Sequence, residues 1–326
     1  MILKKINHRV LQLKLLGVSQ RSMYENLSSL RATRVANTPC TPWFFILVLV
    51  IILSGCVRSV SHDGLLIAVS IPPQAWFVSQ IADDKADTIV LVPPGQNPHN
   101  YEPTPRQIRS LVHASAWVLS GSEFEISLRP KIEALFPNLL IIDGTQGVEF
   151  RFIEEQCTEH DHTFLELDSH TWLGREPAKI LAEEIYNVLS LIDNENRDFY
   201  FENYKRIFWE IEDLFTELKV VLAPLKGKSI FVYHPSFGYF LDEFGIYQEA
   251  VETGGKEPTP RQLNSLIAKI TEEKPAAIFV QAQFPVNAAK TIAESANAEL
   301  IELDPLAQDW FKNIIHMSEA LIRAIP

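Results

Sequence analysis

The sequence predicts an α/β protein with two similar lobes, each holding a mainly parallel sheet flanked by helices, joined by one long rigid helix. Three observations lead to this prediction. Short apolar runs alternate with helical patterns in two separate sets, which is typical of parallel sheets with helical crossovers. A long segment between the two sets has no strand signal, and a six-residue segment occurs once in each set.

The first set predicts the sheet of an N-terminal lobe. Its strand-like runs lie at residues 65–70, 88–92, 117–120 and 139–142. They are short and mostly apolar, as expected for strands that are buried on both faces. Helical patterns between them, for example at 76–82 and 105–113, would connect consecutive parallel strands.

The segment between the two sets, residues 177–225, predicts a helical connection. It contains no glycine and no strand-like run, and its pattern breaks near residues 193–196. The second of the two expected helices runs from Arg197 to about Leu222. At 1.5 Å per residue this helix is about 39 Å long, so it can extend along both lobes as a rigid spine.

The second set predicts a C-terminal lobe. Its strand-like runs lie at 229–233, 277–280 and 300–303, and a helical pattern at 310–325 closes the chain. The repeated segment EPTPRQ occupies 102–107 in the first set and 257–262 in the second. In both copies threonine suits the N-cap of a helix and the following proline suits its first turn. The repeat therefore implies lobes of similar build.

The first 55 residues predict a lipoprotein signal peptide. A basic region precedes an uninterrupted run of eleven apolar residues at 43–53, which is too short to span a bilayer comfortably. The run ends in Leu53-Ser54-Gly55-Cys56, which resembles a bacterial lipobox. We expect removal of the leader and lipidation of Cys56, which would hold the folded body at the membrane. The alternative is a short membrane helix with an incidental cysteine.

These patterns together give the expected boundaries of the chain. They are a signal peptide at 1–55, a tether at 56–64, an N-terminal lobe at 65–193, a connecting helix at 194–224 and a C-terminal lobe at 225–326. Cys40 falls in the leader and Cys157 is the only cysteine besides Cys56 in the mature chain. No disulfide within the mature chain is therefore expected.

The charge is distributed unevenly along the chain. The net charge is −12, but residues 1–55 carry seven basic side chains and one acidic side chain. The body that follows is therefore more acidic than the whole chain. An acidic body argues against nucleic-acid binding, which requires a basic surface, and it is compatible with cations as ligands.

Four potential metal ligands follow strand-like or short apolar runs. They are His99, His170, His234 and Asp304, two from each predicted lobe. The carboxyl ends of strands are where open α/β sheets place their ligand sites. Facing lobes would bring three imidazoles and one carboxylate into the cleft between them. This ligand set suits a four-coordinate divalent metal, with zinc as the first choice.

The segments around these four residues resemble the zinc/manganese solute-binding proteins of ABC importers, the cluster A-I family of zinc-binding periplasmic proteins. The segments are PHNYEPTP at 98–105, SHTWL at 169–173, YHPSFGY at 233–239 and LDPLA at 303–307. The resemblance extends from about Leu65 to the C-terminus. It implies two α/β lobes, one long connecting helix and a metal buried between the lobes, bound by His99, His170, His234 and Asp304.

The resemblance also implies a function. The chain would bind a divalent metal with high affinity outside the cytoplasm and deliver it to the permease and ATPase of an ABC importer. In the family, a glutamate at the third ligand position tends to accompany manganese, and a histidine accompanies zinc or a mixed preference. His234 therefore favours Zn²⁺, with Mn²⁺ as the alternative. The expected protein is a monomer, lipid-anchored at the outer face of the cytoplasmic membrane or periplasmic.

Two features depart from the family pattern. Zinc-specific members often carry a long His-rich acidic loop before the second ligand, whereas this chain has only a short acidic stretch with His160 and His162. This stretch is either a reduced auxiliary zinc site or a solvated acidic turn, because two histidines among acids form only a weak open site. Ser169 replaces the usual proline before the second ligand, which changes the local backbone preference only.

Two other functional classes are compatible with a metal-binding or surface-exposed protein. A zinc-dependent hydrolase usually keeps three protein ligands and an open position for water, and this chain has no His-Glu-x-x-His helix. The sequence therefore predicts a binding protein and not an enzyme. A surface adhesin stays as an alternative, since a lipid-anchored protein is exposed. The remaining histidines of the lobes, His113 and His316, fall in helical patterns and are expected at the surface or in packing roles.

Overall fold

The computed structural model describes residues 64–157, 162–252, 259–273, 275, 277–284 and 287–324. The predicted leader and Cys56 lie outside these residues. From Gly64 onwards the chain forms one compact unit. Among the described helices, none is both long and apolar enough to cross a membrane.

The first lobe contains a four-stranded parallel sheet with strand order β2-β1-β3-β4. The strands are β1 (Leu65–Val69), β2 (Ala86–Val90), β3 (Ala116–Leu119) and β4 (Leu140–Asp143). All four residues of β3 are buried, as are the last three of β1, because helices cover the sheet. The helices are α3 (Pro72–Ala82), α4 (Pro105–Ser110) and α5 (Glu123–Leu135). The predicted strands are confirmed, with ends shifted by one or two residues.

The second lobe repeats this arrangement. Its sheet is also parallel, with strand order β10-β9-β7-β8. The strands are β7 (Ser229–Val232), β8 (Tyr247–Ala250), β9 (Ala277–Val280) and β10 (Glu299–Glu302). In both lobes the first strand of the set lies between the second and the third, with the fourth at the far edge. The prediction of two similar lobes is therefore confirmed.

Strand β8 is not among the strands predicted from the sequence. Its residues Tyr-Gln-Glu-Ala form no apolar run, and they are exposed or half-buried. The strand lies at an edge of its sheet, where only one side is paired and one face meets solvent. Hydrophobic periodicity carries little signal for such a strand.

Both copies of the repeated segment begin a helix. Helix α4 starts at Pro105 behind the N-cap Thr104, whose side chain accepts a hydrogen bond from the Gln107 backbone at 3.4 Å. Helix α9 (Pro260–Glu273) starts in the same way behind Thr259, whose carbonyl accepts from the Leu263 backbone at 2.9 Å. Helix α4 is shorter than expected, because a 3₁₀ turn at Leu111–His113 follows it.

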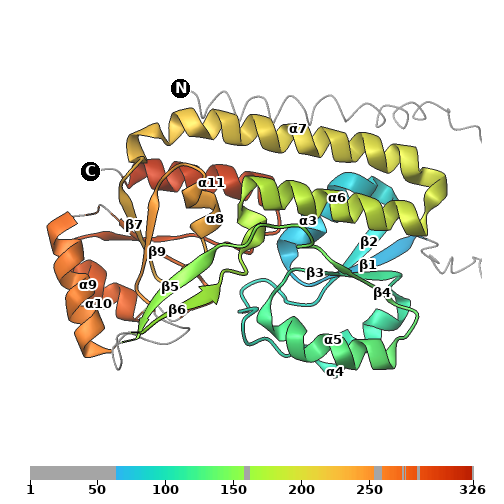
Figure 1. Cartoon of the computed structure of the whole chain (residues 1–326), viewed down its shortest axis with the longest axis horizontal. Coiled ribbons are helices and arrows are strands. Elements are labelled where there is room, and N and C mark those ends of the chain that lie inside the picture. Colours follow the sequence, from blue (N-terminus) through green and yellow to red (C-terminus); the bar gives the residue numbers. More distant parts are fainter. Residues whose placement is uncertain are drawn as a thin grey trace, which may run out of the picture. The chain divides into compact units, whose positions relative to one another are not determined.

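The predicted helical connection is confirmed. It consists of α6 (Arg175–Ile192), a 3₁₀ turn at Asn194–Asn196 and α7 (Arg197–Val221), a helix of 25 residues. Figure 1 shows α7 running along both lobes. It packs on α3 and α6 of the first lobe and on α11 (Trp310–Arg323) of the second.

The C-terminal helix fixes the second lobe to the first. Trp310, the first residue of α11, is fully buried, and its ring centroid lies 5.2 Å from that of Phe77 on α3. The indole of Trp310 donates to the carbonyl of Trp172 at 2.6 Å, and the indole of Trp172 donates to the carbonyl of Pro305 at 2.8 Å. These two bonds join the lobes next to the loop that carries Asp304.

The acidic stretch before the second predicted ligand forms a β-hairpin. Strands β5 (Phe152–Cys157) and β6 (His162–Leu167) pair antiparallel. From the sequence, this stretch is expected to be either a reduced auxiliary zinc site or a solvated acidic turn, and no strand pairing is predicted, because acidic and polar residues hide any apolar alternation. Backbone hydrogen bonds between adjacent strands do not require such alternation. His162 pairs with Cys157 across the hairpin, and His160 lies outside the described residues.

Candidate metal centre

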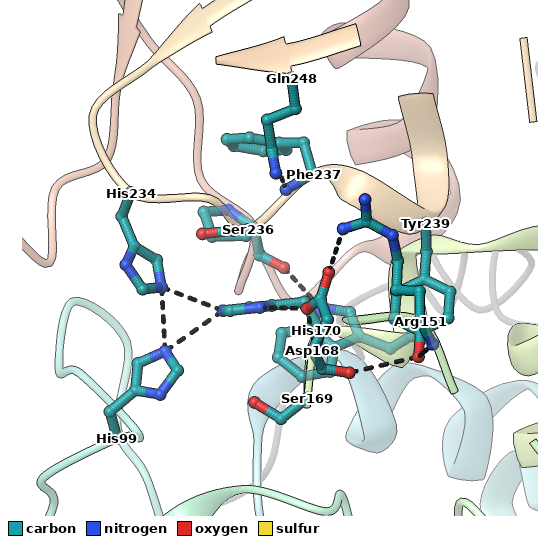
Figure 2. A network of polar contacts seen from close by, with 12 residues as sticks. His99, Arg151, Asp168, Ser169, His170, His234, Ser236, Phe237, Tyr239 and Gln248 are labelled. Atoms are coloured by element: carbon teal, nitrogen blue, oxygen red, sulfur yellow. Dashed lines mark hydrogen bonds and ion pairs between the residues drawn. The ribbon is translucent and has the colours of Figure 1, made fainter. Parts of the chain in front are cut away.

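Three histidines converge where the two lobes meet. His99 lies in the loop between β2 and α4, His170 just before the 3₁₀ turn Thr171–Leu173, and His234 two residues after β7. Their Nε2 atoms form a small triangle (Figure 2) with sides of 3.0 Å between His99 and His234, 3.3 Å between His99 and His170, and 3.3 Å between His170 and His234. Within the described residues, these three form the group of side chains that could hold a metal ion.

His170 follows a strand, as expected, but this strand is not part of the four-stranded parallel sheet of the first lobe. The strand is β6, which belongs to the antiparallel hairpin. The chain leaves the sheet after β4, forms the hairpin and returns through Asp168 to the edge where His99 lies. Sequence periodicity gives the short apolar segment before His170 but cannot assign it to a sheet.

The size of the triangle suits one divalent ion. Two nitrogens bound to a tetrahedral zinc at 2.0–2.1 Å lie about 3.3–3.4 Å apart. The observed Nε2 separations of 3.0–3.3 Å are close to this value. Three imidazole nitrogens at this separation place their electron pairs together, which is unfavourable unless a cation lies between them.

A carboxylate holds the outer nitrogen of each histidine. The Nδ1 atom lies 2.8 Å from Glu123 for His99, 2.8 Å from Asp168 for His170, and 2.9 Å from Glu252 for His234. A carboxylate accepts, so each Nδ1 donates and each Nε2 keeps its electron pair for a metal. Carboxylate–histidine pairs of this kind orient metal ligands and increase their basicity.

These three carboxylates are not among the site residues predicted from the sequence. Asp168 stands two residues before His170, and this proximity was the one available signal. Glu123 begins α5, and Glu252 follows β8, a strand that the sequence did not reveal. Both glutamates reach their histidine only because the fold brings separate strand ends to one edge.

The environment keeps two of these carboxylates, Glu123 and Asp168, charged. Burial works against ionisation of Glu123, but its hydrogen bond and charge interaction with His99 outweigh burial and lower its pKa to about 2. For Asp168 burial again opposes ionisation, and the hydrogen bond and charge interaction with His170 lower the pKa below its usual value. At neutral pH both groups are therefore acceptors for their histidines.

The environment also keeps His234 neutral. Burial is the main cause that lowers its pKa to about 4, and the neighbouring His170 and His99 act in the same direction against Glu252. The backbone of His234 is fixed by Gln281, which follows β9 and accepts from its backbone N–H at 3.2 Å. Neutral imidazole is the form that binds a metal.

Apolar walls surround the triangle. The ring of Phe284 stacks on His234 with centroids 4.3 Å apart, and Trp172 packs beside His170 at 5.5 Å. The pocket around the histidines is also lined by Pro305 and Leu306. These contacts limit the access of water, so electrostatic interactions with a bound cation would be stronger than in solvent.

Asp304 lies beside this pocket but outside the triangle of ligand atoms. Its Oδ1 accepts from the Gln283 amide at 2.7 Å and from the Leu306 backbone at 2.9 Å. Asn313 on α11 donates to its carbonyl at 2.7 Å. The loop of Asp304 is therefore well held, and the role of its carboxylate as fourth ligand stays a prediction.

The other predicted site residues are placed as follows. His113 and His316 are exposed, as expected for residues without a role in the site. His160 and Cys56 lie outside the described residues, and His162 is described only by its backbone in β6. The auxiliary metal site and the lipid attachment remain predictions.

Comparisons with known proteins agree with this geometry. The sequence model of the family described as "Zinc-uptake complex component A periplasmic" (ZnuA) matches residues 67–324. A solved structure, "Crystal structure of ZnuA", is similar with a TM-score of 0.75 and 34% identity, covering 80% of this chain and 99% of that chain.

Two curated relatives differ in the metal that their names give. The high-affinity zinc uptake system protein ZnuA of Yersinia pestis is 26% identical over 263 residues, 74% of this chain and 82% of that protein. The manganese ABC transporter substrate-binding lipoprotein PsaA of Streptococcus mitis is 27% identical over 263 residues, 77% of this chain and 83% of that protein.

Proposed function

Since this chain belongs to the ZnuA family of extracytoplasmic metal-binding proteins that serve ABC importers, we propose that its cargo is zinc, with manganese as the alternative. The family consists of solute-binding proteins and not of enzymes, so the zinc hydrolase weighed above is excluded. The proposal concerns which metal is bound, how it is held and how the chain is retained at the cell envelope.

One observation carries the choice of zinc. Three imidazole nitrogens from both lobes form a triangle of the size that zinc requires, and a carboxylate holds each imidazole in the ligating tautomer. Imidazole ligands suit zinc, whereas manganese prefers sites richer in carboxylate. His234 supplies an imidazole at the position where a glutamate would favour manganese.

We assign the fourth ligand to Asp304. Its loop lines the pocket beside the histidines, and its backbone and Oδ1 are held by Asn313, Gln283 and Leu306. A movement of this carboxylate towards the triangle would close a tetrahedral site. Four protein ligands leave no open position for a reactive water, which suits binding and transport.

The proposed retention of the chain at the cell envelope is based on its sequence. The proposed mature chain begins at Cys56, carries a lipid there, and presents a tether, two lobes (65–193 and 225–326) and the connecting helix 194–224. A monomer would pass its metal to the permease and ATPase of the importer. Labelling with a radioactive fatty acid tests the anchor: the wild type should incorporate label, and Cys56→Ala should not.

Metal analysis tests the proposed cargo. The protein from residue 57 onwards, which includes the whole compact unit, would be purified and its metal measured by mass spectrometry. Competitive titration with Zn²⁺ and Mn²⁺ would follow. We expect one tightly held zinc per chain and a clear preference for Zn²⁺.

The other outcomes are equally informative. Preferential retention of manganese would overturn zinc as the cargo and keep the importer function. Absence of any tight metal would overturn the three-histidine site. The adhesin alternative predicts that binding to host-surface proteins survives in a His99→Ala variant that has lost its metal, because adhesion would use another surface.

A further inference from the structure

Arg151 contacts carboxylates from both lobes. It precedes β5 in the first lobe, where its Nη1 donates to Asp168 Oδ2 at 2.5 Å. Its Nε donates to Asp242 Oδ2 at 2.9 Å, and Asp242 is the last residue of α8 (Gly238–Asp242) in the second lobe. A planar guanidinium has the fork geometry to hold two carboxylates at once.

The same contact reaches the metal site. Asp168 is fully buried, and its other oxygen, Oδ1, accepts from His170 Nδ1 at 2.8 Å and from the His170 backbone at 3.0 Å. His170, Asp168 and Arg151 therefore form a continuous chain of hydrogen bonds (Figure 2). Arg151 extends this chain to Asp242 in the second lobe. An imidazole whose carboxylate is itself fixed has little freedom to turn away from the metal.

Helix α8 supplies further contacts from the second lobe. The hydroxyl of Tyr239 accepts from the Arg151 backbone at 3.1 Å and donates to the Asp168 carbonyl at 3.2 Å. Gly238 lies against the guanidinium: a Cβ at this position would be 1.5 Å from Arg151 Nη1. The second lobe thus leaves just enough room for the arginine, and only glycine provides that room.

We propose that Arg151 is a positioning residue that couples the metal ligand His170 to the contact between the lobes. This inference rests on the proposed metal-binding function. When the lobes separate at α8, Arg151 loses Asp242 and Tyr239, Asp168 loses its fixed partner, and His170 loses its fixed orientation. By thermodynamic linkage, the free energy by which the contact between the lobes strengthens metal binding equals the free energy by which metal binding strengthens that contact. An importer that pulls the lobes apart would weaken metal binding before any ligand leaves.

Arg175 provides a matched comparison. It begins α6 in the first lobe, and its Nη2 lies 3.0 Å from Glu243, the residue that follows Asp242. It also pairs with Glu212 on α7 at 3.5 Å. Both arginines line the same cleft. Each therefore bridges the lobes, but of the two only Arg151 contacts a carboxylate that holds one of the three histidines, as far as the described residues show.

The first experiment compares Arg151→Gln with Arg175→Gln in the full-length protein. Zinc dissociation would be measured by transfer to a chromogenic chelator in a stopped-flow instrument. We expect Arg151→Gln to accelerate dissociation about 5- to 10-fold, at or just below the 10- to 100-fold effects of residues that directly hold a ligand, because Arg151 acts through Asp168. Arg175→Gln should stay within about 2-fold of the wild type. Equal rates for the two variants would overturn the inference.

Variants in the second lobe test the coupling from the other side. Asp242→Asn and Gly238→Ala change no residue near the triangle, yet both should accelerate dissociation, because each disturbs the guanidinium. Combined with Arg151→Gln, either should add little, since residues in one network are not additive. Fully additive effects would show that α8 acts independently of Arg151. If Arg151→Gln does not fold, the conservative variant Asp242→Asn still tests the coupling between α8 and the metal site.

A spectroscopic readout separates positioning from general stability. In the cobalt-loaded protein, the visible d–d absorption bands report the arrangement of the ligands. Arg151→Gln should shift these bands and Arg175→Gln should not, even if both lower the thermal midpoint. Unshifted bands in Arg151→Gln would reject a positioning role. A wild type without tight zinc would contradict the proposed function, whereas a zinc-binding wild type with two equivalent arginine variants contradicts only this inference.

Discussion

His99 and His234 belong to opposite lobes, yet their Nε2 atoms lie 3.0 Å apart, and a glutamate faces the outer nitrogen of each ring. Neither lobe alone can form this pair. The Trp172 and Trp310 indoles fix the relative position of the lobes beside it. The metal centre and the contact between the lobes are therefore parts of one structure, and both can be probed by substitutions.

Removal of His234 should abolish most zinc binding. Structural zinc sites with four ligands contribute about 10–16 kcal/mol, so one ligand corresponds to about 2.5–4 kcal/mol, or roughly a 70- to 1,000-fold loss of affinity. His234→Ala should show this loss in a competitive chelator titration and keep its circular dichroism spectrum. The exposed His316→Ala is the control and should bind like the wild type. Unchanged affinity in His234→Ala would remove the site.

The carboxylate behind His99 should contribute without touching the metal. Glu123→Gln keeps the shape of the side chain but replaces the charged acceptor, so zinc affinity should fall about 10- to 100-fold. Glu133 lies on the same helix, is half-exposed and pairs only with Arg129 among its described contacts. The control variant Glu133→Gln should therefore leave the zinc affinity unchanged. Equal affinities of the two variants would mean that Glu123 does not support His99.

The role of Asp304 can be tested by a neutral, isosteric change. Asp304→Asn can still accept from Gln283 and Leu306 but lacks the negative charge of a ligand. We expect a loss of zinc affinity of at least about 10-fold and a change in the cobalt absorption bands. Glu302→Gln, exposed at the end of β10, is the control. If Asp304→Asn had the zinc affinity and cobalt absorption bands of the wild type, Asp304 would not be the fourth metal ligand.

The metal-free protein should lose stability in acid through His234. Burial lowers the folded-state pKa of His234 to about 4 from an ordinary 6.5. Between these values the unfolded state binds more protons, so the free energy of unfolding falls as the pH drops from 6.5 towards 4. The contribution is about 3 kcal/mol, since one pKa unit equals about 1.36 kcal/mol. This contribution to the free energy of unfolding is fully present above pH 6.5 and is lost as the pH falls towards 4.

The predicted loss of stability in acid can be checked by urea unfolding at pH 7 and pH 4.5, with the metal-free wild type and His234→Gln compared. The variant lacks the titrating group, so its stability should fall by about 2–3 kcal/mol less than that of the wild type over this range. A direct check is the NMR titration of the His234 ring, whose midpoint should lie near pH 4. Parallel pH dependences would contradict the effect of burial on His234.

Two tryptophans should differ sharply in their effect on stability. Trp310→Ala removes a fully buried indole that packs on Phe77 and donates to Trp172, so the free energy of unfolding should fall by about 3–5 kcal/mol. Trp209 on α7 is 63% exposed. The substitution Trp209→Ala should therefore change the free energy of unfolding by at most about 0.5 kcal/mol. Similar losses in urea unfolding would show that α11 does not anchor the lobes.

Some parts of the structure could be predicted because their signal is local. The buried strands, the break before α7, and the helix starts at Pro105 and Pro260 follow from apolar runs, glycine absence and capping residues. Strand β8 and the β5–β6 hairpin could not, because edge and hairpin strands are stabilised by backbone pairing that leaves no apolar pattern.

The sequence by itself determined the two-lobe α/β build and, as candidate ligands of a divalent metal, the histidines at positions 99, 170 and 234 together with Asp304. Only the tertiary structure decided that Glu123, Asp168 and Glu252 hold these histidines and that Arg151 joins Asp168 to the other lobe. The reason is physical. Ligand chemistry is a property of a side chain, whereas its orientation depends on partners that most often lie far away in the chain and become neighbours only when two sheet edges face each other.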